Sequence, residues 1–186
     1  TGPTGSGKTT TLYSILGHIN AEGINIMTLE DPVEYPMAQI RQTAVSDAAR
    51  LDFANGVRAM LRQDPDVILV GEIRDGDTAR MAFQAAMTGH QVYSTLHTSS
   101  AIGAIPRLLD LGIVPDILAG NLIGIVAQRL VRRLCIHCRE PYPAADYEMR
   151  LLGCATDDAR PTLFRAKGCP HCEHQRYQGR TGILPP

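Results

Sequence analysis

The sequence has few of the features that mark membrane-spanning or nucleic-acid-binding proteins. Its 186 residues carry a formal net charge of −1, with no tryptophan and only three phenylalanines. A near-neutral balance without a strip of basic and aromatic residues gives no indication of nucleic-acid binding or of attraction to an anionic membrane. The longest apolar stretch, residues 113–127, contains Pro115, Asp116 and Asn121, so it does not predict a transmembrane helix.

The remaining bulk properties are those of an ordinary soluble protein. Hydrophobic residues make up 44% of the chain and charged residues 20%, and no signal peptide is visible. The length predicts one domain, or one domain with a small appendage, and is sufficient for a substantial core.

A phosphate-binding loop opens the chain. Gly2, Gly7, Lys8 and Thr9 fit the pattern G-x-x-x-x-G-K-[ST]. Glycines let the backbone approach an anion, the lysine reaches the β- and γ-phosphates, and the threonine hydroxyl holds Mg²⁺. A glycine-rich turn with a chance lysine is the alternative, and the helix predicted directly afterwards argues against it. The candidate nucleotide-binding residues here are Gly2, Pro3, Thr4, Gly5, Ser6, Gly7, Lys8, Thr9 and Thr10.

Hydrophobic periodicity predicts alternating helices and strands. Strands are expected over residues 24–29, 39–45, 67–70 and 91–96, and helices over residues 8–19, 47–63, 75–89 (capped by Asp75 or Asp77), 101–111 and 116–129. The run 67–70 is apolar throughout, which is typical of a strand buried on both faces of a parallel sheet. This order predicts an α/β domain with a mainly parallel sheet and site residues at the carboxyl ends of the strands.

The periodicity fails after Leu134, which predicts a domain boundary there. We expect an ATPase domain over residues 1–134 and a four-cysteine metal-binding subdomain over residues 135–186. A phosphate loop normally follows a strand, and a new strand is predicted to begin where the sequence stops. The first domain is therefore expected to be truncated at its amino end, without its first strand, and the second at its carboxyl end.

The apolar strand 67–70 leads into Gly71 and Glu72. A hydrophobic strand that ends in an acid beside a phosphate loop is the Walker B arrangement, which handles Mg²⁺ and the attacking water. Gly71 stands where many such enzymes carry the aspartate that holds Mg²⁺. Glu72 is therefore the candidate that orients and deprotonates water, the alternative being a solvated glutamate at a strand end.

Two further polar clusters follow predicted strands. One is E-D-P-V-E, from Glu30 to Glu34, and the other places His90 and His97 on either side of a strand. A carboxylate can hold a magnesium-bound water, and a histidine can donate a hydrogen bond to the γ-phosphate. Each cluster has a polar strand terminus as its alternative. The presence of the phosphate loop favours function for Glu30, Glu34 and His97, and less so for His90 and for Asp31.

Two cysteine pairs occupy the last part of the chain. Cys135, Cys138, Cys169 and Cys172 supply four thiolates for a tetrahedral Zn²⁺, although the gap between the pairs exceeds the commonest ribbon spacing. Free reduced thiols or a disulfide are the alternatives. Cys154 is left over and is interpreted as an apolar filler. Since four cysteines leave no open coordination position, we expect the zinc to be structural.

Together these motifs resemble the secretion ATPases of the type II secretion and type IV pilus assembly family. The resemblance rests on residues 2–9 (Walker A), 29–34 (the Asp box of the family), 61–75 (Walker B), 89–98 (the His box), 127–131 and 179–183. These segments cover nearly the whole chain. The cysteine pairs favour the assembly or export branch over pilus-retraction and conjugative relatives, which typically lack them.

The resemblance implies a RecA-like P-loop NTPase domain in a hexameric cytoplasmic motor that docks to a platform protein of the bacterial inner membrane. Such motors use ATP hydrolysis to extrude a pilus or pseudopilus, and no nucleic-acid partner is expected. Carried over to this sequence, Glu72 is the catalytic glutamate and Lys8 and Thr9 bind phosphate and Mg²⁺. Glu30 and Glu34 lie near the metal, and His97 contacts the γ-phosphate. The implied catalytic set is therefore Glu72, Lys8, His97 and Glu34.

Two other classes of function stay open. One is a DNA-handling RecA-like motor or conjugative ATPase, and the other is a non-catalytic, zinc-stabilised docking module. GTP is disfavoured as a substrate because the sequence has no Asn-Lys-x-Asp motif. The resemblance also implies an N-terminal domain that supplies arginines and further C-terminal helices, so we expect this chain by itself to hydrolyse ATP poorly and to form hexamers poorly.

Overall fold

A computed structural model describes residues 1–46, 48–49, 51–155 and 159–184. The chain folds into two compact units, one formed by residues 1–129 with Leu184 and the other by residues 130–183. Strand β5 (Arg129–Leu134) therefore lies almost wholly in the second unit, whereas the boundary expected from the sequence follows Leu134. Among the described residues, no helix has both the length and the apolar character needed to cross a membrane.

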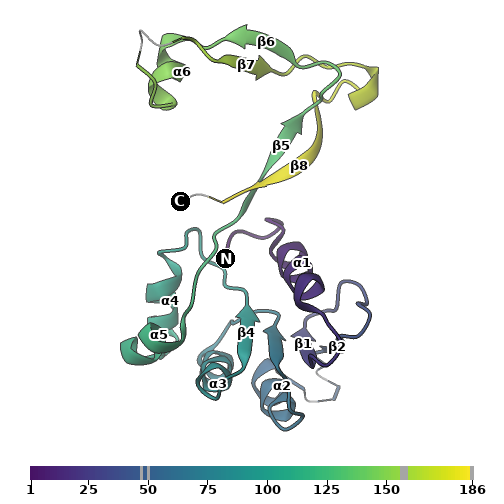
Figure 1. Cartoon of the computed structure of the whole chain (residues 1–186), viewed down its shortest axis with the longest axis vertical. Helices are drawn as coiled ribbons and strands as arrows, with labels where there is room; N and C mark the ends of the chain where they lie inside the picture. Colours follow the sequence, from purple (N-terminus) through teal and green to yellow (C-terminus); the bar gives the residue numbers. More distant parts are fainter. Residues whose placement is uncertain (47, 50, 156–158, 185–186) are drawn as a thin grey trace. The chain divides into compact units, whose positions relative to one another are not determined.

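The first unit is built on a four-stranded parallel sheet (Figure 1). Its strands are β1 (Ile26–Glu30), β2 (Arg41–Ala44), β3 (Val67–Val70) and β4 (Gln91–Ser94), arranged in the order β2-β1-β3-β4. The parallel α/β architecture predicted from the sequence is confirmed. Since all four strands run in the same direction, their carboxyl ends share one edge of the sheet.

The described residues of this unit form five helices: α1 (Lys8–Ile19), α2 (Phe53–Met60), α3 (Gly76–Met87), α4 (Ala104–Asp110) and α5 (Pro115–Asn121). Of the two predicted caps for α3, Asp75 is the one used, and its carboxylate accepts from the Thr78 N–H at 2.8 Å. Helix α2 begins later than predicted because Asp52 caps it in the same way. The predicted start at Asp47 lies outside the described residues.

Strand β3 is buried on both faces, as the apolar run 67–70 predicted. Ile68 and Val70 belong to the core that contains α2 and α3. Val67 and Leu69 belong to a separate core with Tyr13 and Leu16 of α1. Alternation of strand side chains thus places α1 on one face of the sheet and α2 and α3 on the other.

The predicted helix over residues 116–129 is wrong after Asn121. The chain leaves the helix at Leu122, and β5 begins at Arg129. Glycines at 120 and 124 and β-branched residues at 123, 125 and 126 all lower helix propensity, which explains the early end. The irregular stretch runs back to the phosphate loop, where the Gln128 N–H donates to the Thr1 carbonyl at 2.9 Å.

The second unit contains two small sheets, one of β5 with β8 (Tyr177–Ile183), and one of β6 (Glu140–Pro143) antiparallel to β7 (Thr162–Arg165). Helix α6 (Asp146–Leu151) and the 3₁₀ turn η1 (Pro170–Cys172) complete the unit. Its described buried apolar residues are Cys135, Cys138, Ala144, Met149 and Cys172. Cysteines form most of this core.

Candidate functional site

The phosphate loop turns through two left-handed glycines before α1 begins at Lys8. Gly5 and Gly7 have φ angles of 76° and 83°, a conformation that favours glycine. Gly7 is the N-cap of α1 and offers no side chain to its first-turn N–H groups, and no acidic residue lies in that turn. These N–H groups and the positive end of the helix dipole are therefore available to an anion.

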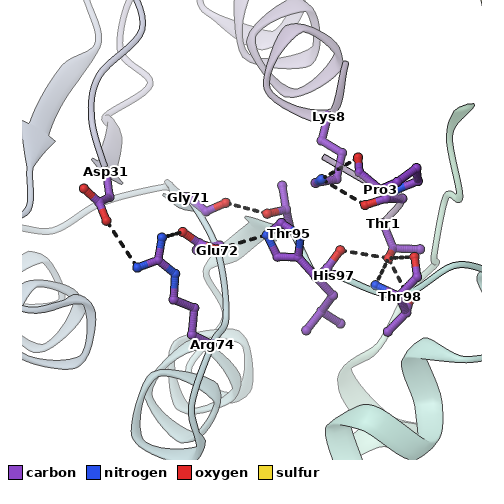
Figure 2. A network of polar contacts seen from close by, with 12 residues as sticks. Thr1, Pro3, Lys8, Asp31, Gly71, Glu72, Arg74, Thr95, His97 and Thr98 are labelled. Atoms are coloured by element: carbon purple, nitrogen blue, oxygen red, sulfur yellow. Dashed lines mark hydrogen bonds and ion pairs between the residues drawn. The ribbon is translucent and has the colours of Figure 1, made fainter. Parts of the chain in front are cut away.

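Lys8 closes the loop on itself. Its ammonium donates to the carbonyls of Gly2 at 2.9 Å and Pro3 at 3.2 Å (Figure 2). Burial lowers the pKa of Lys8, and the negative charge of Glu72 offsets part of this effect. Lys8 and Glu72, both predicted to belong to the site, therefore affect one another electrostatically.

Glu72 follows β3 directly, at the carboxyl edge of the sheet. Its side chain is only 14% exposed and is held by the Arg74 guanidinium and by His97, whose Nε2 lies 3.1 Å from Glu72 Oε2. Arg74 also reaches Asp31 at 3.3 Å, which ties the acidic loop after β1 to this group (Figure 2). The structure thus brings together Glu72, His97 and Asp31, which the sequence placed at three separate strand ends.

The Glu72 carboxyl group is ionised more readily than an ordinary glutamate. Burial by itself raises its pKa, but hydrogen bonds and charge from Arg74, with a smaller contribution from His97, outweigh burial and lower the pKa overall. The carboxylate is therefore in its charged, proton-accepting form and is oriented by Arg74 and His97, although the same partners that lower its pKa also make it a weaker base.

The backbone around Glu72 is fixed by the neighbouring strands. The Gly71 N–H donates to the Leu29 carbonyl at 2.8 Å, and the Thr95 hydroxyl donates to the Gly71 carbonyl at the same distance. A Cβ on Gly71 would lie 3.1 Å from the Leu29 oxygen. The position at which many P-loop enzymes carry an aspartate is thus closely packed against β1.

Glu30 has a different environment from the one expected. It is 3% exposed, and its carboxylate accepts hydrogen bonds from Tyr13, from Thr28 at 2.5 Å and from Gln42 at 3.3 Å. These donors come from α1, β1 and β2. The Glu30 side chain therefore connects the helix after the phosphate loop to the sheet, and a position beside Mg²⁺ stays a prediction.

The remaining predicted site residues differ in their distance from the phosphate loop. Thr9 is half-buried in the first turn of α1, next to the exposed Thr10. Glu34 is exposed, and its N–H contacts the Tyr13 hydroxyl at 3.3 Å. His90 precedes β4, so it lies at the opposite end of that strand from His97 and contacts the Ala85 carbonyl at 3.0 Å.

Sequence reasoning missed several residues that organise this site. Arg74 lies two positions after Glu72, and an arginine so close to a candidate catalytic acid was a usable signal. The Thr1 hydroxyl contacts the Leu96 carbonyl at 2.8 Å and accepts from the Thr98 N–H at 3.0 Å, on either side of His97. Nothing in the sequence indicates this long-range contact.

Four cysteine sulfurs form a cluster in the second unit. The Sγ atoms of Cys135, Cys138, Cys169 and Cys172 all lie within 4.8 Å of one another. Three of the pairs are separated by 3.8–3.9 Å. Tetrahedral zinc with Zn–S bonds of about 2.3 Å requires sulfurs about 3.8 Å apart. All four cysteines are free, and the donor set and spacing fit zinc.

Backbone N–H groups support these sulfurs. Gly168 donates to the Cys138 sulfur and Cys169 to the Cys172 sulfur, both at 3.3 Å. Such bonds stabilise thiolates and fix their orientation around a metal. Cys154 lies outside the cluster, as expected.

Comparisons with known proteins agree with this geometry. The family model described as "Type II/IV secretion system protein" matches residues 1–185. The type II secretion system protein E of Pseudomonas aeruginosa is 57% identical over 183 residues, which cover 98% of this chain and 36% of the relative. The type II secretion system ATPase E of Vibrio cholerae is 54% identical over the same shares. The chain thus spans about a third of these relatives' length.

A solved structure shares the fold. The crystal structure of the pilus retraction motor PilT with bound ADP superimposes with a TM-score of 0.65 at 36% identity, covering 88% of this chain and 44% of PilT. It has the α/β architecture with a mainly parallel sheet that is seen here. From the family match and the extent of these identities, the chain belongs to the type II/IV secretion system protein family and, within it, to the secretion ATPases.

Proposed function

We propose that this chain is part of a Mg²⁺-dependent, ATP-hydrolysing motor that powers type II protein secretion or type IV pilus assembly. Membership of the secretion ATPase family supports ATPase activity. The observation that carries the proposal is the Glu72 carboxylate, which is held by Arg74 and His97 at the carboxyl edge of the sheet and is near enough to Lys8 of the phosphate loop to affect its pKa. A cation for phosphate and a base for water thus belong to one site.

In this mechanism the Lys8 ammonium exchanges its contacts with the Gly2 and Pro3 carbonyls for oxygens of the β- and γ-phosphates. Glu72 accepts a proton from a water molecule as that water's oxygen bonds to the γ-phosphorus and the bond from phosphorus to the β–γ bridging oxygen breaks. His97 orients the Glu72 carboxylate, and its hydrogen bond to the γ-phosphate stays a prediction.

Mg²⁺ would be held by the Thr9 hydroxyl. The first turn of α1 fits this role, because no acidic side chain and no side-chain cap occupies its N–H groups. These groups are therefore free to bind the phosphates that Mg²⁺ accompanies. When bound, Mg²⁺ neutralises charge on the phosphate oxygens. The roles of Glu30 and Glu34 near the metal stay predictions.

We propose that the four cysteines hold a structural zinc ion. Four thiolates complete a tetrahedral shell and leave no position for water. The second unit has a small described apolar core that consists mainly of these cysteines, so a metal would supply much of its stability.

For the assembled protein we propose a homohexamer at the cytoplasmic face of the inner membrane, working with a platform protein and other secretion or pilus components. The relatives are named as type II secretion system proteins, which supports a role within such machinery.

Substitution of Glu72 tests the catalytic proposal. Hydrolysis is measured with this chain replacing the matching segment of a full-length relative, so that sequence outside the chain is not limiting. Glu72→Gln should keep nucleotide affinity within about threefold and lower kcat by about 10²-fold or more. Glu22→Gln alters an exposed glutamate beyond α1 and is the matched control. Unchanged turnover in Glu72→Gln would remove Glu72 from this role.

Two measurements address the other classes of function. Saturable, salt-sensitive binding of DNA would favour a DNA-handling or conjugative motor. A chain that binds zinc but does not bind ATP would favour the docking module. We expect ATP binding and no DNA binding.

A further inference from the structure

Gln128 makes three hydrogen bonds to the phosphate loop and its helix, although it follows them by more than a hundred residues. Its N–H donates to the Thr1 carbonyl at 2.9 Å, its Nε2 donates to the Ser6 carbonyl at 2.8 Å, and its Oε1 accepts from the Thr11 hydroxyl at 2.7 Å. These contacts span the loop from its first residue to the first turns of α1. The function proposed above assigns no role to Gln128.

The chemistry of the contacts explains why an amide stands at this position. The Ser6 carbonyl can only accept, so the amide nitrogen must face Ser6 and the amide oxygen must face Thr11. A carboxylate of the same shape would still accept from the Thr11 hydroxyl, but it would set an oxygen against the Ser6 carbonyl. A side chain without both a donor and an acceptor loses one contact or both.

The backbone of the same residue also shapes the loop. A Cβ on Gly2 would lie only 2.3 Å from the Gln128 carbonyl oxygen. The chain at Gln128 therefore passes so close to the loop that only glycine fits opposite it. Gly2 is required by packing against Gln128 as well as by the approach of a phosphate.

Ser6 shows how closely the loop is enclosed here. The residue is 3% exposed, and its hydroxyl has no hydrogen-bond partner among the described residues. The Ser6 carbonyl, in contrast, is bonded to Gln128. The peptide that precedes Gly7 and Lys8 is thus oriented by Gln128, and this peptide carries the turn that directs the N–H groups of the loop toward an anion.

We infer that Gln128 is a positioning residue that holds the phosphate loop in its binding conformation by bridging Ser6 and Thr11. The inference rests on the proposed phosphate-binding function of the loop. Gln128 does not itself touch the phosphates. It lowers the cost of ordering the loop when nucleotide binds, so its loss should weaken nucleotide binding.

Two matched pairs of variants test the bridge in the 186-residue chain. Gln128→Glu keeps the shape and reverses one contact, and Gln84→Glu on the exposed face of α3 is its control. Thr11→Val removes the hydroxyl, and Thr11→Ser restores it. With a fluorescent ADP as the probe, we expect dissociation constants about tenfold higher for Gln128→Glu and about fivefold higher for Thr11→Val. Gln84→Glu and Thr11→Ser should stay within about twofold of the unaltered chain.

Hydrogen–deuterium exchange without nucleotide separates this inference from the proposed function. Faster exchange of a peptide covering residues 2–12 in Gln128→Glu and Thr11→Val, but not in their controls, supports the bridge even if the unaltered chain binds no ADP. Absent ADP binding by the unaltered chain would count against the proposed function alone. Unchanged exchange and affinity in both Gln128→Glu and Thr11→Val would overturn the inference.

Discussion

The Nε2 atom of His97 lies 3.1 Å from a carboxylate oxygen of Glu72, although 25 positions separate the two residues. The contact follows from the sheet. Val70 at the end of β3 pairs with Ser94 at the end of β4, so the segments that leave these strands emerge side by side. Parallel pairing thus makes one site of two distant sequence motifs, and it brings a basic ring to a carboxylate that Arg74 already contacts.

Replacing Arg74 should raise the pKa of Glu72. In the folded chain this pKa lies below its ordinary value of 4.5, so its contribution to stability is present above pH 4.5 and is lost as the pH falls through the lowered value. Arg74→Gln removes the larger stabilising partner of the carboxylate. NMR titration of the Glu72 carboxyl carbon should show an upward shift in Arg74→Gln and a smaller one in His97→Ala. Arg80→Gln, which alters an exposed pair with Asp77, is the control.

Removal of the Tyr13 hydroxyl should destabilise the first unit. Tyr13 is fully buried and donates to Glu30, so Tyr13→Phe leaves a buried carboxylate with one donor fewer. We expect a loss of about 1–3 kcal/mol in the free energy of unfolding, measured with urea. The control is Tyr93→Phe. The Tyr93 hydroxyl makes an exposed contact with Gln91, so its removal should lower the free energy of unfolding by less than about 0.5 kcal/mol. Equal effects of the two substitutions would contradict the importance of the buried hydrogen bond.

The same hydroxyl predicts a dependence on alkaline pH. Burial, followed by the hydrogen bond to Glu30, raises the pKa of Tyr13 to about 12. A raised phenol pKa contributes stability that is present below pH 10 and is lost as the pH rises from 10 toward 12. The unaltered chain should therefore lose more stability than Tyr13→Phe across this range, as measured by urea unfolding at several pH values. A parallel decline of both proteins would contradict this prediction.

Zinc content should depend on four of the five cysteines. The purified chain is expected to contain one zinc ion, measured by atomic emission, and Cys135→Ser should lose it and unfold its second unit at a lower temperature. Cys154→Ser removes a cysteine outside the cluster and should keep the metal. Metal loss in both variants, or in neither, would contradict the four-cysteine site.

Two glycine-to-alanine substitutions should change stability in opposite directions. A Cβ on Gly56 in α2 would lie 2.3 Å from a methyl carbon of the fully buried Leu29, so Gly56→Ala should cost about 1–3 kcal/mol. Gly17 lies exposed in the last turn of α1, where a Cβ meets only Met37 at 3.8 Å. Gly17→Ala should therefore stabilise by about 0.5–1 kcal/mol. Urea unfolding of the two variants provides the comparison, and stabilisation by Gly56→Ala would show that Leu29 can move aside.

The elements that were predictable are those whose local pattern agrees with their packing. Helix α1 has the predicted limits Lys8–Ile19, and β3 has the predicted limits Val67–Val70, because both combine clear periodicity with burial. The sequence pattern also predicts a helix over residues 122–128, where none forms. Their actual path depends on Gln128 reaching Thr1 and Ser6, a tertiary contact that local sequence does not encode.

The site was predictable as a set of strand ends but not as a set of contacts. Glu72 and His97 could be predicted because each follows a predicted strand and parallel strands end together. The partners of Glu30 could not be found, because its burial depends on Tyr13 and Gln42 approaching from different elements. The sequence proximity of Arg74 to Glu72 was a usable signal, but the second contact of Arg74, with Asp31, depends on β1 pairing beside β3.

The enclosure of Glu30 has a consequence for how this family can change over time. Tyr13 and Gln42 share one buried carboxylate, and Gln42 also contacts the Tyr13 hydroxyl at 3.3 Å. The loss of any one of Tyr13, Gln42 and Glu30 leaves a charged or polar group without a partner inside the domain. Joint replacement of all three by apolar residues need not do so. Substitutions at these positions should therefore be inherited together, and lineages that lack the glutamate should lack the tyrosine hydroxyl as well.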